Sequence, residues 1–344
     1  MFRTVLYGAV ALTVGVSVVA PAYSTADQGR ADAWKRSYDQ IVDRYCAGGL
    51  AAAGGDPLTW TSDDVNRAQG ATRALDPQRR MAAAALHVEV VAAQWRDEDR
   101  RVLMNHGMLA RDLANESRRA GTLARGLVRS WALAWGYLLL AHTAYAEAER
   151  HFATMRTWFP NDADFTVAGG IVNELLASPL GQQTRRGSLA GSLAAVDAQP
   201  FRARAISLYR AAFDTAPDHA EGHLRLGRTL FLNGDEAAAA VELERALAAS
   251  TDRRIVYLQH LFLGALFERQ DRLPEAERQY DMSAAAVPGA QTATLALTAL
   301  RIRMGKGPVV PAAMVQYDPW NDYLFSRPYR FRQVLDELRQ AACR

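Results

Sequence analysis

The chain has 344 residues, of which 49% are hydrophobic and 22% charged, and its formal net charge is +3. This composition excludes wholesale disorder. The small net charge, with arginines interleaved with acidic residues along expected helices, gives no indication of a nucleic-acid partner. Alanine, leucine and arginine dominate the sequence, and all three favour helix. We therefore expect a folded, mainly helical protein that does not bind nucleic acid.

Residues 1–26 are predicted to be a secretory signal peptide. Arg3 precedes an apolar run over 5–20, and small residues follow at Ala22, Ser24 and Ala26. The run is short for a membrane span, and the small residues are typical of a signal peptidase site. We expect cleavage after Ser24 or Ala26, and a periplasmic or cell-surface bacterial protein. An uncleaved anchor is the alternative, and it is the one membrane contact that the sequence suggests.

Residues 27–128 are predicted to form a divergent helical region, either of degenerate repeats or as a helical cap. Apolar residues recur there at helical spacing. A loop is expected over 48–60, and His87 is expected on a helix surface. The expected helices cover 31–46, 61–75, 77–96, 101–119 and 122–128.

Residues 129–304 contain a helix-pair pattern with a period of about 34 residues. It occurs over 129–162, 220–253 and 257–290, and a degenerate pair covers 164–177 and 200–215 around an inserted loop at about 178–199. Gly136, Gly227 and Gly264 stand where the two helices of a pair would approach most closely. Prolines end the second helices, because proline cannot continue a helix. These prolines are Pro160, Pro217 and Pro288.

This pattern resembles the tetratricopeptide repeat family. The resemblance implies an all-α solenoid of antiparallel helix pairs, in which the first helix of each pair lines a concave face that takes an extended peptide or a helix. Tyr137, Arg228 and Ala265 occupy the position where the carboxylate-binding members have Asn, so a carboxylate clamp is not expected. The residues carried over as partner-binding candidates are Leu133, Tyr137, Leu140, Glu221, Leu224, Arg228, Phe231, Leu258, Leu261 and Glu268.

Residues 305–344 are predicted to be an aromatic tail that ends in a helix over 333–342. Its Tyr317-Asp-Pro-Trp320 segment resembles the tails of some exported bacterial tetratricopeptide proteins. We expect a helix over 292–304 to need a cover for its apolar face. The aromatic segment 317–331, with Leu335 and Leu338, would supply that cap. A free docking motif for another protein is the alternative.

Two cysteines, Cys46 and Cys343, stand near opposite ends of the mature chain. An oxidising compartment permits a disulfide, but a bridge needs Cα atoms within about 7 Å. The ends of an extended solenoid are expected to lie farther apart than that, so the sequence leaves the pairing open.

No sequence motif indicates a catalytic residue, a cofactor or a metal site. His219 and His223 have a spacing that can hold a metal, but the favoured interpretation is a polar first turn with Asp218 as the helix cap. The leading hypothesis is an exported, non-catalytic scaffold that binds another protein or peptide. An enzyme or enzyme subunit is an alternative, and a pocket gathering His87, His106 and carboxylates would favour it. A structural envelope protein that self-associates is a third.

Overall fold

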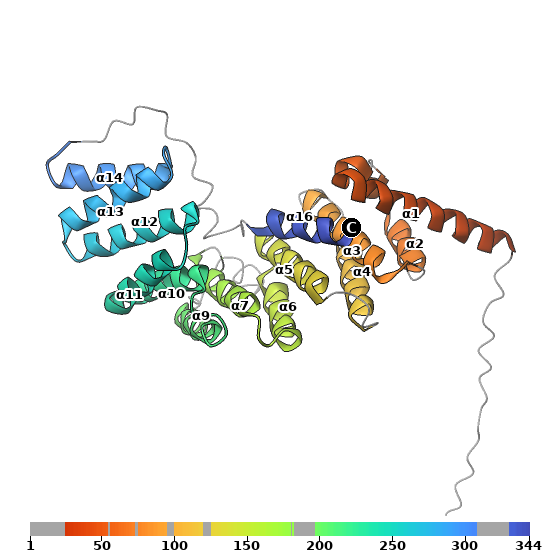
Figure 1. The fold of residues 1–344 in the computed structure, drawn as a ribbon, viewed down its shortest axis with the longest axis horizontal. Coiled ribbons are helices and arrows are strands. Elements are labelled where there is room, and N and C mark those ends of the chain that lie inside the picture. Colours follow the sequence, from red (N-terminus) through yellow and green to blue (C-terminus); the bar gives the residue numbers. More distant parts are fainter. Residues whose placement is uncertain are drawn as a thin grey trace, which may run out of the picture.

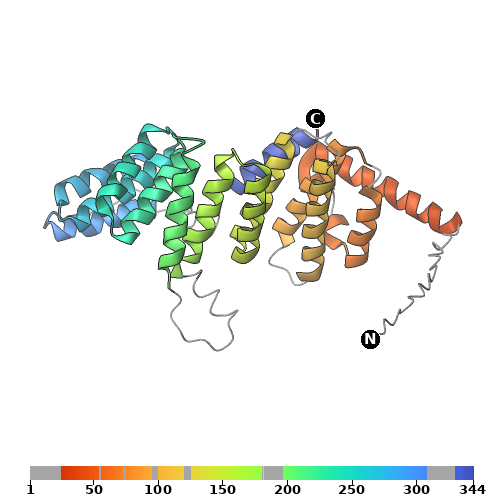
Figure 2. The same ribbon diagram turned by 90° about the horizontal axis from the view of Figure 1, so that it is seen from below.

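The computed structural model describes residues 25–53, 56–72, 75–94, 100–119, 125–179, 181, 197–307 and 330–344. Within these ranges the chain is almost entirely helical. The helices form antiparallel pairs that stack side by side in one elongated row, seen from two directions in Figures 1 and 2. The all-α solenoid predicted from the sequence is therefore confirmed.

The N-terminal part of the row follows the divergent region. The elements here are α1 (Thr25–Ala53), the 3-10 helix η1 (Asp56–Thr59), α2 (Ser62–Thr72), α3 (Pro77–Gln94) and α4 (Arg100–Arg119). The loop expected over 48–60 is partly wrong, because α1 continues to Ala53 across a kink at Gly48 and Gly49. Gly49 takes a φ of 72°, a backbone conformation that glycine tolerates without strain. The predicted signal peptide lies outside the described residues, except for Thr25 and Ala26.

The remaining helices follow the predicted pairs to within a few residues. They are α5 (Arg125–Ala141), α6 (Tyr145–Trp158), α7 (Ala163–Leu176), α9 (Gln199–Ala212), α10 (Ala220–Asn233), α11 (Glu236–Ala248), α12 (Arg253–Arg269), α13 (Leu273–Ala286), α14 (Gln291–Arg303) and α16 (Arg330–Ala342). The helix expected from residue 122 begins at Arg125 and continues as the first helix of the first predicted repeat, ending at Ala141. Residues 182–196 of the inserted loop lie outside the described ranges.

A glycine on the first helix of a pair faces a large side chain of the second helix at several points along the row. A Cβ added at Gly264 would lie 2.5 Å from the ring of Tyr280, and one at Gly227 would lie 2.7 Å from Cγ of Leu243. Tyr280 and Leu243 are both buried. The missing side chain thus lets the two helices approach, as the repeat pattern predicted.

The C-terminal helix α16 returns to the N-terminal half of the row. It packs along α5 and α3 and reaches α1 (Figure 1). The expectation that Leu335 and Leu338 cover α14 is wrong, because both are buried in the core shared with α3 and α5. The reason is that α3 and α5, in the N-terminal half of the row, present a second apolar surface, and Leu335 and Leu338 pack there instead. Residues 308–329, which hold most of the expected aromatic cap, lie outside the described ranges.

On α14 itself, the apolar residues divide between two sides. Leu297 and Leu300 are buried in one core cluster with Tyr280 of α13, whereas Leu295 and Ile302 are 54% and 58% exposed. The packing of α13 against α14 therefore covers half of the apolar face of α14 for which the sequence showed no partner.

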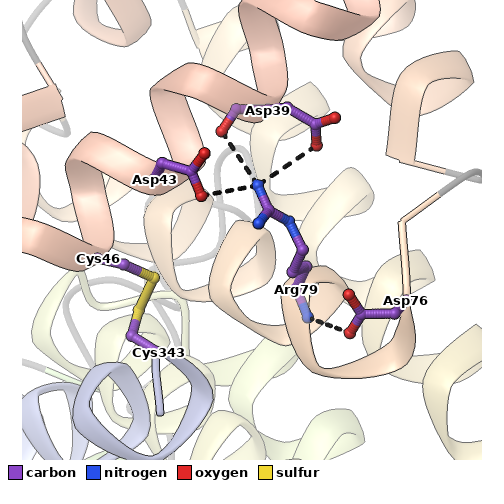
Figure 3. Close-up of a disulfide and its surroundings, with 6 residues drawn as sticks. All are labelled: Asp39, Asp43, Cys46, Asp76, Arg79 and Cys343. Carbon is purple, nitrogen blue, oxygen red and sulfur yellow. Dashed lines mark hydrogen bonds and ion pairs between the residues drawn. A yellow bond between two sulfur atoms is a disulfide. The ribbon is translucent and has the colours of Figure 1, made fainter.

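The return of α16 brings Cys343 beside Cys46, and the two form a disulfide with a Cα–Cα distance of 5.2 Å (Figure 3). The extended row does hold its two ends apart, but the chain's C-terminus is not at the end of the row. Nearby, Arg79 of α3 makes ion pairs with Asp39 and Asp43 of α1. The disulfide and this arginine both fasten α1 to its neighbours.

Replacing Gly227 or Gly264 by leucine should destabilise the protein. Each new side chain would overpack a contact between two helices, at a cost of about 1–3 kcal/mol. Gly126 offers a matched control, because it is exposed and a Cβ there meets nothing within 4 Å. Thermal melting should therefore show a lower midpoint for Gly227→Leu and Gly264→Leu than for Gly126→Leu. Equal midpoints for all three variants would mean that the repeat register is wrong.

Candidate partner-binding face

The first helices of successive pairs lie next to one another and form one face of the row. Contacts join α1 to α3, α3 to α5, α7 to α10 and α10 to α12. We call the surface built by these helices the inner face. Helix α16 packs on its N-terminal part, along α1, α3 and α5.

Most of the partner-binding candidates from the sequence are buried in helix packing. Phe231 and Glu268 are partly exposed, and Glu221 and Arg228 are buried within ion pairs. The candidates in the apolar core are Leu133, Tyr137, Leu140, Leu224, Leu258 and Leu261. Burial establishes what these side chains pack against in this state of the protein, and their role toward a partner stays a prediction.

A buried network of charges joins α7, α9 and α10 beneath the inner face. Glu174 of α7 accepts hydrogen bonds from the guanidinium groups of Arg225 and Arg228, with a distance of 3.1 Å to Arg225. Arg225 also pairs with Glu221 at 2.9 Å. All four side chains are at most 9% exposed. Two carboxylates are thus set against two guanidinium groups, which is the condition for burying such charges.

Tyr209 of α9 adds a neutral donor to this network. Its hydroxyl donates a hydrogen bond of 2.7 Å to Oε2 of Glu174. Burial, followed by the negative charge of Glu174, raises the pKa of Tyr209 well above its usual value. The phenol therefore stays protonated and works as a fixed hydrogen-bond donor. The network links three helices through directional contacts.

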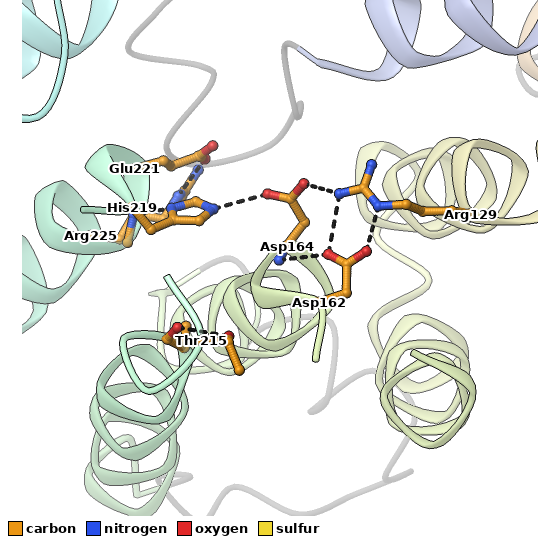
Figure 4. A network of polar contacts seen from close by, with 9 residues as sticks. Arg129, Asp162, Asp164, Thr215, His219, Glu221 and Arg225 are labelled. Carbon is orange, nitrogen blue, oxygen red and sulfur yellow. Dashed lines mark hydrogen bonds and ion pairs between the residues drawn. The ribbon is translucent and has the colours of Figure 1, made fainter. Parts of the chain in front are cut away.

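A second network, drawn in Figure 4, joins three neighbouring pairs at the start of α7. Arg129 of α5 forms ion pairs with Asp162 and Asp164, and Asp162 also caps α7 by accepting the N–H of Asp164. His219, at the start of α10, donates from Nε2 to Asp164 at 2.9 Å. Burial alone would raise the pKa of Asp164, but the hydrogen bond from His219 and the charge of Arg129 outweigh it and hold the pKa below its usual range.

His219 and His223 have separate structural partners. His219 is itself the cap of α10, since its Nδ1 accepts the N–H of Gly222, so the assignment of that role to Asp218 is wrong. His223 instead faces Glu242 of α11 at 2.6 Å. Among the residues that the structure describes, no group of three or more His, Cys, Asp or Glu side chains is arranged to hold a metal ion.

Two arginine–phenylalanine contacts join the adjacent helices α10 and α12. The guanidinium of Arg269 lies 3.8 Å from the ring centroid of Phe231, and that of Arg228 lies 5.8 Å from the ring of Phe262. Both rings are partly exposed. We call these four residues the α10–α12 strip. Partly exposed aromatic and arginine side chains are the types enriched at protein interfaces.

His87 and His106 meet in the N-terminal half, within a cluster of aromatic rings. Their Nδ1 atoms lie 2.5 Å apart, and the Tyr38 hydroxyl lies 3.0 Å from Nε2 of His87. The ring of Trp60 stacks on His106 with centroids 5.7 Å apart. The expectation of a surface position for His87 is wrong, because its side chain is fully buried.

Burial keeps this histidine pair uncharged. It lowers the pKa of His106 to about 4 and that of His87 well below its usual value. Within the described part of the chain, the pair's hydrogen-bond and ring contacts are with each other, Tyr38 and Trp60, and not with carboxylates. The enzyme alternative predicted a pocket that gathers His87, His106 and carboxylates. The two histidines do meet, but the described residues in contact with them include no carboxylate that would suit acid–base chemistry.

Comparison with known proteins bears on one segment of this row. Residues 202–259, which span α9, α10, α11 and the start of α12, match the family model of the tetratricopeptide repeat. This segment is similar to the tetratricopeptide repeat. It holds Tyr209, the charged residues of α10 and the Gly227 contact, so these features lie within the matched segment.

Solved structures with a similar fold include a thermophilic TPR protein of Thermus thermophilus and MamA. The first is 16% identical, with a TM-score of 0.42, and the match covers 64% of this chain and 99% of that one. MamA is 15% identical, with a TM-score of 0.35, and the match covers 58% of this chain and 86% of that one. No curated protein sequence matches the chain.

Sequence reasoning missed Glu174 and Arg225. Two signals were available. Glu174 follows a run of apolar and small residues from Val167 to Val172, an unusual place for a carboxylate. Arg225 stands four residues after Glu221 on one helix, the spacing of an ion pair. What the sequence could not supply was the approach of α7 to α10.

Replacing Glu174 by glutamine should destabilise the solenoid. The change removes one of two carboxylates that balance the buried guanidinium groups of Arg225 and Arg228, and breaking a buried ion pair costs about 3 kcal/mol or more. Glu147→Gln is the matched control, because Glu147 pairs with Arg150 on the surface, where such pairs contribute about 0–1 kcal/mol. Urea unfolding followed by circular dichroism compares the two. Equal midpoints would show that the buried network contributes nothing to stability.

Proposed function

We propose that this protein is an exported, non-catalytic scaffold that binds another protein or peptide on its inner face. The observation that carries the proposal is the row of stacked helix pairs, one segment of which matches the tetratricopeptide repeat. The first helices contact one another from α1 through α3 to α5 and from α7 through α10 to α12, and such a face suits an extended or helical ligand. The α10–α12 strip supplies partly exposed aromatic rings on that face.

The strip offers a ligand two kinds of contact at once. Phe231 and Phe262 present apolar surface, and the exposed Arg269 holds positive charge over the ring of Phe231. Arg228 contacts the ring of Phe262 and is buried in its ion pair with Glu174. Aromatic and arginine anchors contribute most of the binding energy in many protein interfaces. The site residues that we propose to touch the partner are therefore the exposed edges of this strip, together with Glu268, which accepts a hydrogen bond from Tyr280.

Export is supported by two features of different kinds. The apolar run and small residues of segment 1–26 have the pattern of a cleaved signal. The Cys46–Cys343 disulfide suits an oxidising compartment, because such bridges are rare in reducing ones. Among the described residues, no helix is both long and apolar enough to cross a bilayer.

A photo-crosslinking amino acid tests the binding face. Placed at Phe262, it should give one discrete adduct with a partner protein in living cells. Val241, which is 46% exposed on the second helix α11, is the control position and should give none. A Phe231→Ala change should reduce the Phe262 adduct, because it removes a neighbouring anchor from the same strip. Adducts of equal yield from both positions, or from neither, would refute the inner face as the binding surface.

The predicted maturation is tested by N-terminal sequencing of the protein isolated from its own cells. The mature chain should begin at Thr25 or Asp27, since cleavage is expected after Ser24 or Ala26. Replacing Ala22 and Ser24 by arginine should block processing, because signal peptidase requires small residues there. A wild-type chain that still begins at Met1 would establish the uncleaved anchor instead.

A further inference from the structure

Helix α16 occupies the inner face in the manner of a bound ligand. Its buried side chains include Val334, Leu335, Leu338 and Ala342, which form one stripe, while Asp336, Glu337 and Gln340 on the other side are exposed. It is thus an amphipathic helix that packs one face onto the solenoid. It lies across three first helices, which is where a scaffold of this kind would hold a partner helix.

The surface beneath α16 is built to be covered. Every residue of α3 from Met81 to Val88 is buried, so this helix is enclosed on all sides. Helix α5 is also buried around most of its circumference. Their other neighbours are α1, α4 and α6, and α16 completes the enclosure. Without α16, an apolar face of α3 and α5 would lack one of its covering helices.

A polar contact next to this apolar surface adds specificity. The guanidinium of Arg339 lies against Gly49 at the kink of α1, where an added Cβ would collide with it. Burial and the negative charge of Glu89 raise the pKa of Tyr45, and Arg339 lies close enough to that phenol for its charge to oppose part of the rise. The kink therefore makes room for an arginine that stands next to Leu338 of the apolar stripe.

The disulfide is the covalent link that holds α16 in this place. Cys46 and Cys343 are both partly exposed, so a small dithiol can reach the bridge. A dithiol reductant would supply two electrons and two protons, becoming a disulfide itself while Cys46 and Cys343 become thiols. After reduction, α16 would be held by its packing alone. An isolated helix of this length is only marginally stable in water.

From these contacts we infer that the face of α1, α3 and α5 is a groove for an amphipathic helix, which we call the α16 groove, and that α16 fills it while the disulfide is closed. Reduction of Cys46–Cys343 lets α16 leave, and a partner helix with the same apolar stripe and an arginine beside it takes its place. This inference rests on the proposed function and adds to the α10–α12 strip a second binding segment of the inner face, with the class of helix that it takes and the condition under which it opens.

The probe for this groove is a fluorescent synthetic peptide of residues 330–344 with Cys343→Ser, followed by fluorescence anisotropy. The oxidised wild-type chain should not bind it, because the groove is filled. The full-length variant Leu335→Asp/Leu338→Asp/Cys343→Ser should bind it at least about tenfold more tightly than the reduced wild type, because its own helix no longer competes at high effective concentration. A peptide carrying both Leu→Asp changes should not bind.

The matched control is Gln340→Asp/Cys343→Ser, which alters the exposed side of α16 and keeps its stripe. It should behave like the reduced wild type. Equal peptide binding by the oxidised wild type and the stripe variant would refute the groove. A dimer of the reduced wild type in size-exclusion chromatography, held by exchanged α16 helices, would also refute it, because the groove would then serve a second copy.

Hydrogen exchange on the unmodified chain covers the case in which the stripe variant does not fold. Reduction should speed the exchange of amides in α16 at least about tenfold, and unchanged protection would overturn the inference. The outcome separates from that of the proposed function. Crosslinking at Phe262 without peptide binding would support the scaffold function and refute the groove. Peptide binding without any cellular adduct would support the groove and refute the scaffold function.

Discussion

The close approach of the two helices in each pair is the contact on which the rest of this structure depends. A single amphipathic pair cannot bury both of its apolar sides, so each pair must stack on the next. Within a pair, the helices come close where the first presents a small residue to the second, as Gly264 does to Tyr280. The position of every side chain on the inner face follows from this spacing.

The same spacing explains why charges could be placed in the interior. Once α7, α9 and α10 lie close together, Glu174 can reach two arginines and a tyrosine that stand 35 to 54 residues away in the chain. A buried ion pair contributes little more stability than apolar packing would, but it requires one alignment of the helices. The second network at Asp164 connects α5, α7 and α10 in a similar way. We interpret both networks as fixing the register between neighbouring pairs.

The local part of this architecture was predictable, and the distant part was not. The helices from 129 to 304 and their glycine contacts follow from residue spacing, because each repeat contacts mainly its neighbours. The burial of Glu221 and Arg228 was not foreseeable from α10 alone, since Glu174, which completes their network by pairing with Arg225 and Arg228, belongs to another helix. The position of α16 was missed for a related reason. Its stripe shows that Leu335 and Leu338 need a partner surface, but nothing in the sequence says which of several apolar faces supplies it.

The pairing of the two cysteines, which the sequence left open, could not be decided for the same reason. Distance along a solenoid normally follows distance along the chain, and that rule fails as soon as the last helix folds back. His87 shows the limit at a smaller scale. A histidine beside a glutamate looks like surface in the sequence, and the rings of Tyr38 and Trp60 that enclose it come from other elements.

The disulfide also changes the topology of the whole molecule. The bridge joins positions separated by 297 residues, so nearly the entire described chain forms one covalent ring. A protease that cuts any single peptide bond inside this ring, for example in the inserted loop between α7 and α9, opens the ring without separating two pieces. The repeats on either side of the cut remain parts of one molecule. In an environment that contains proteases, such a ring keeps its two halves together after damage that would divide an ordinary linear solenoid.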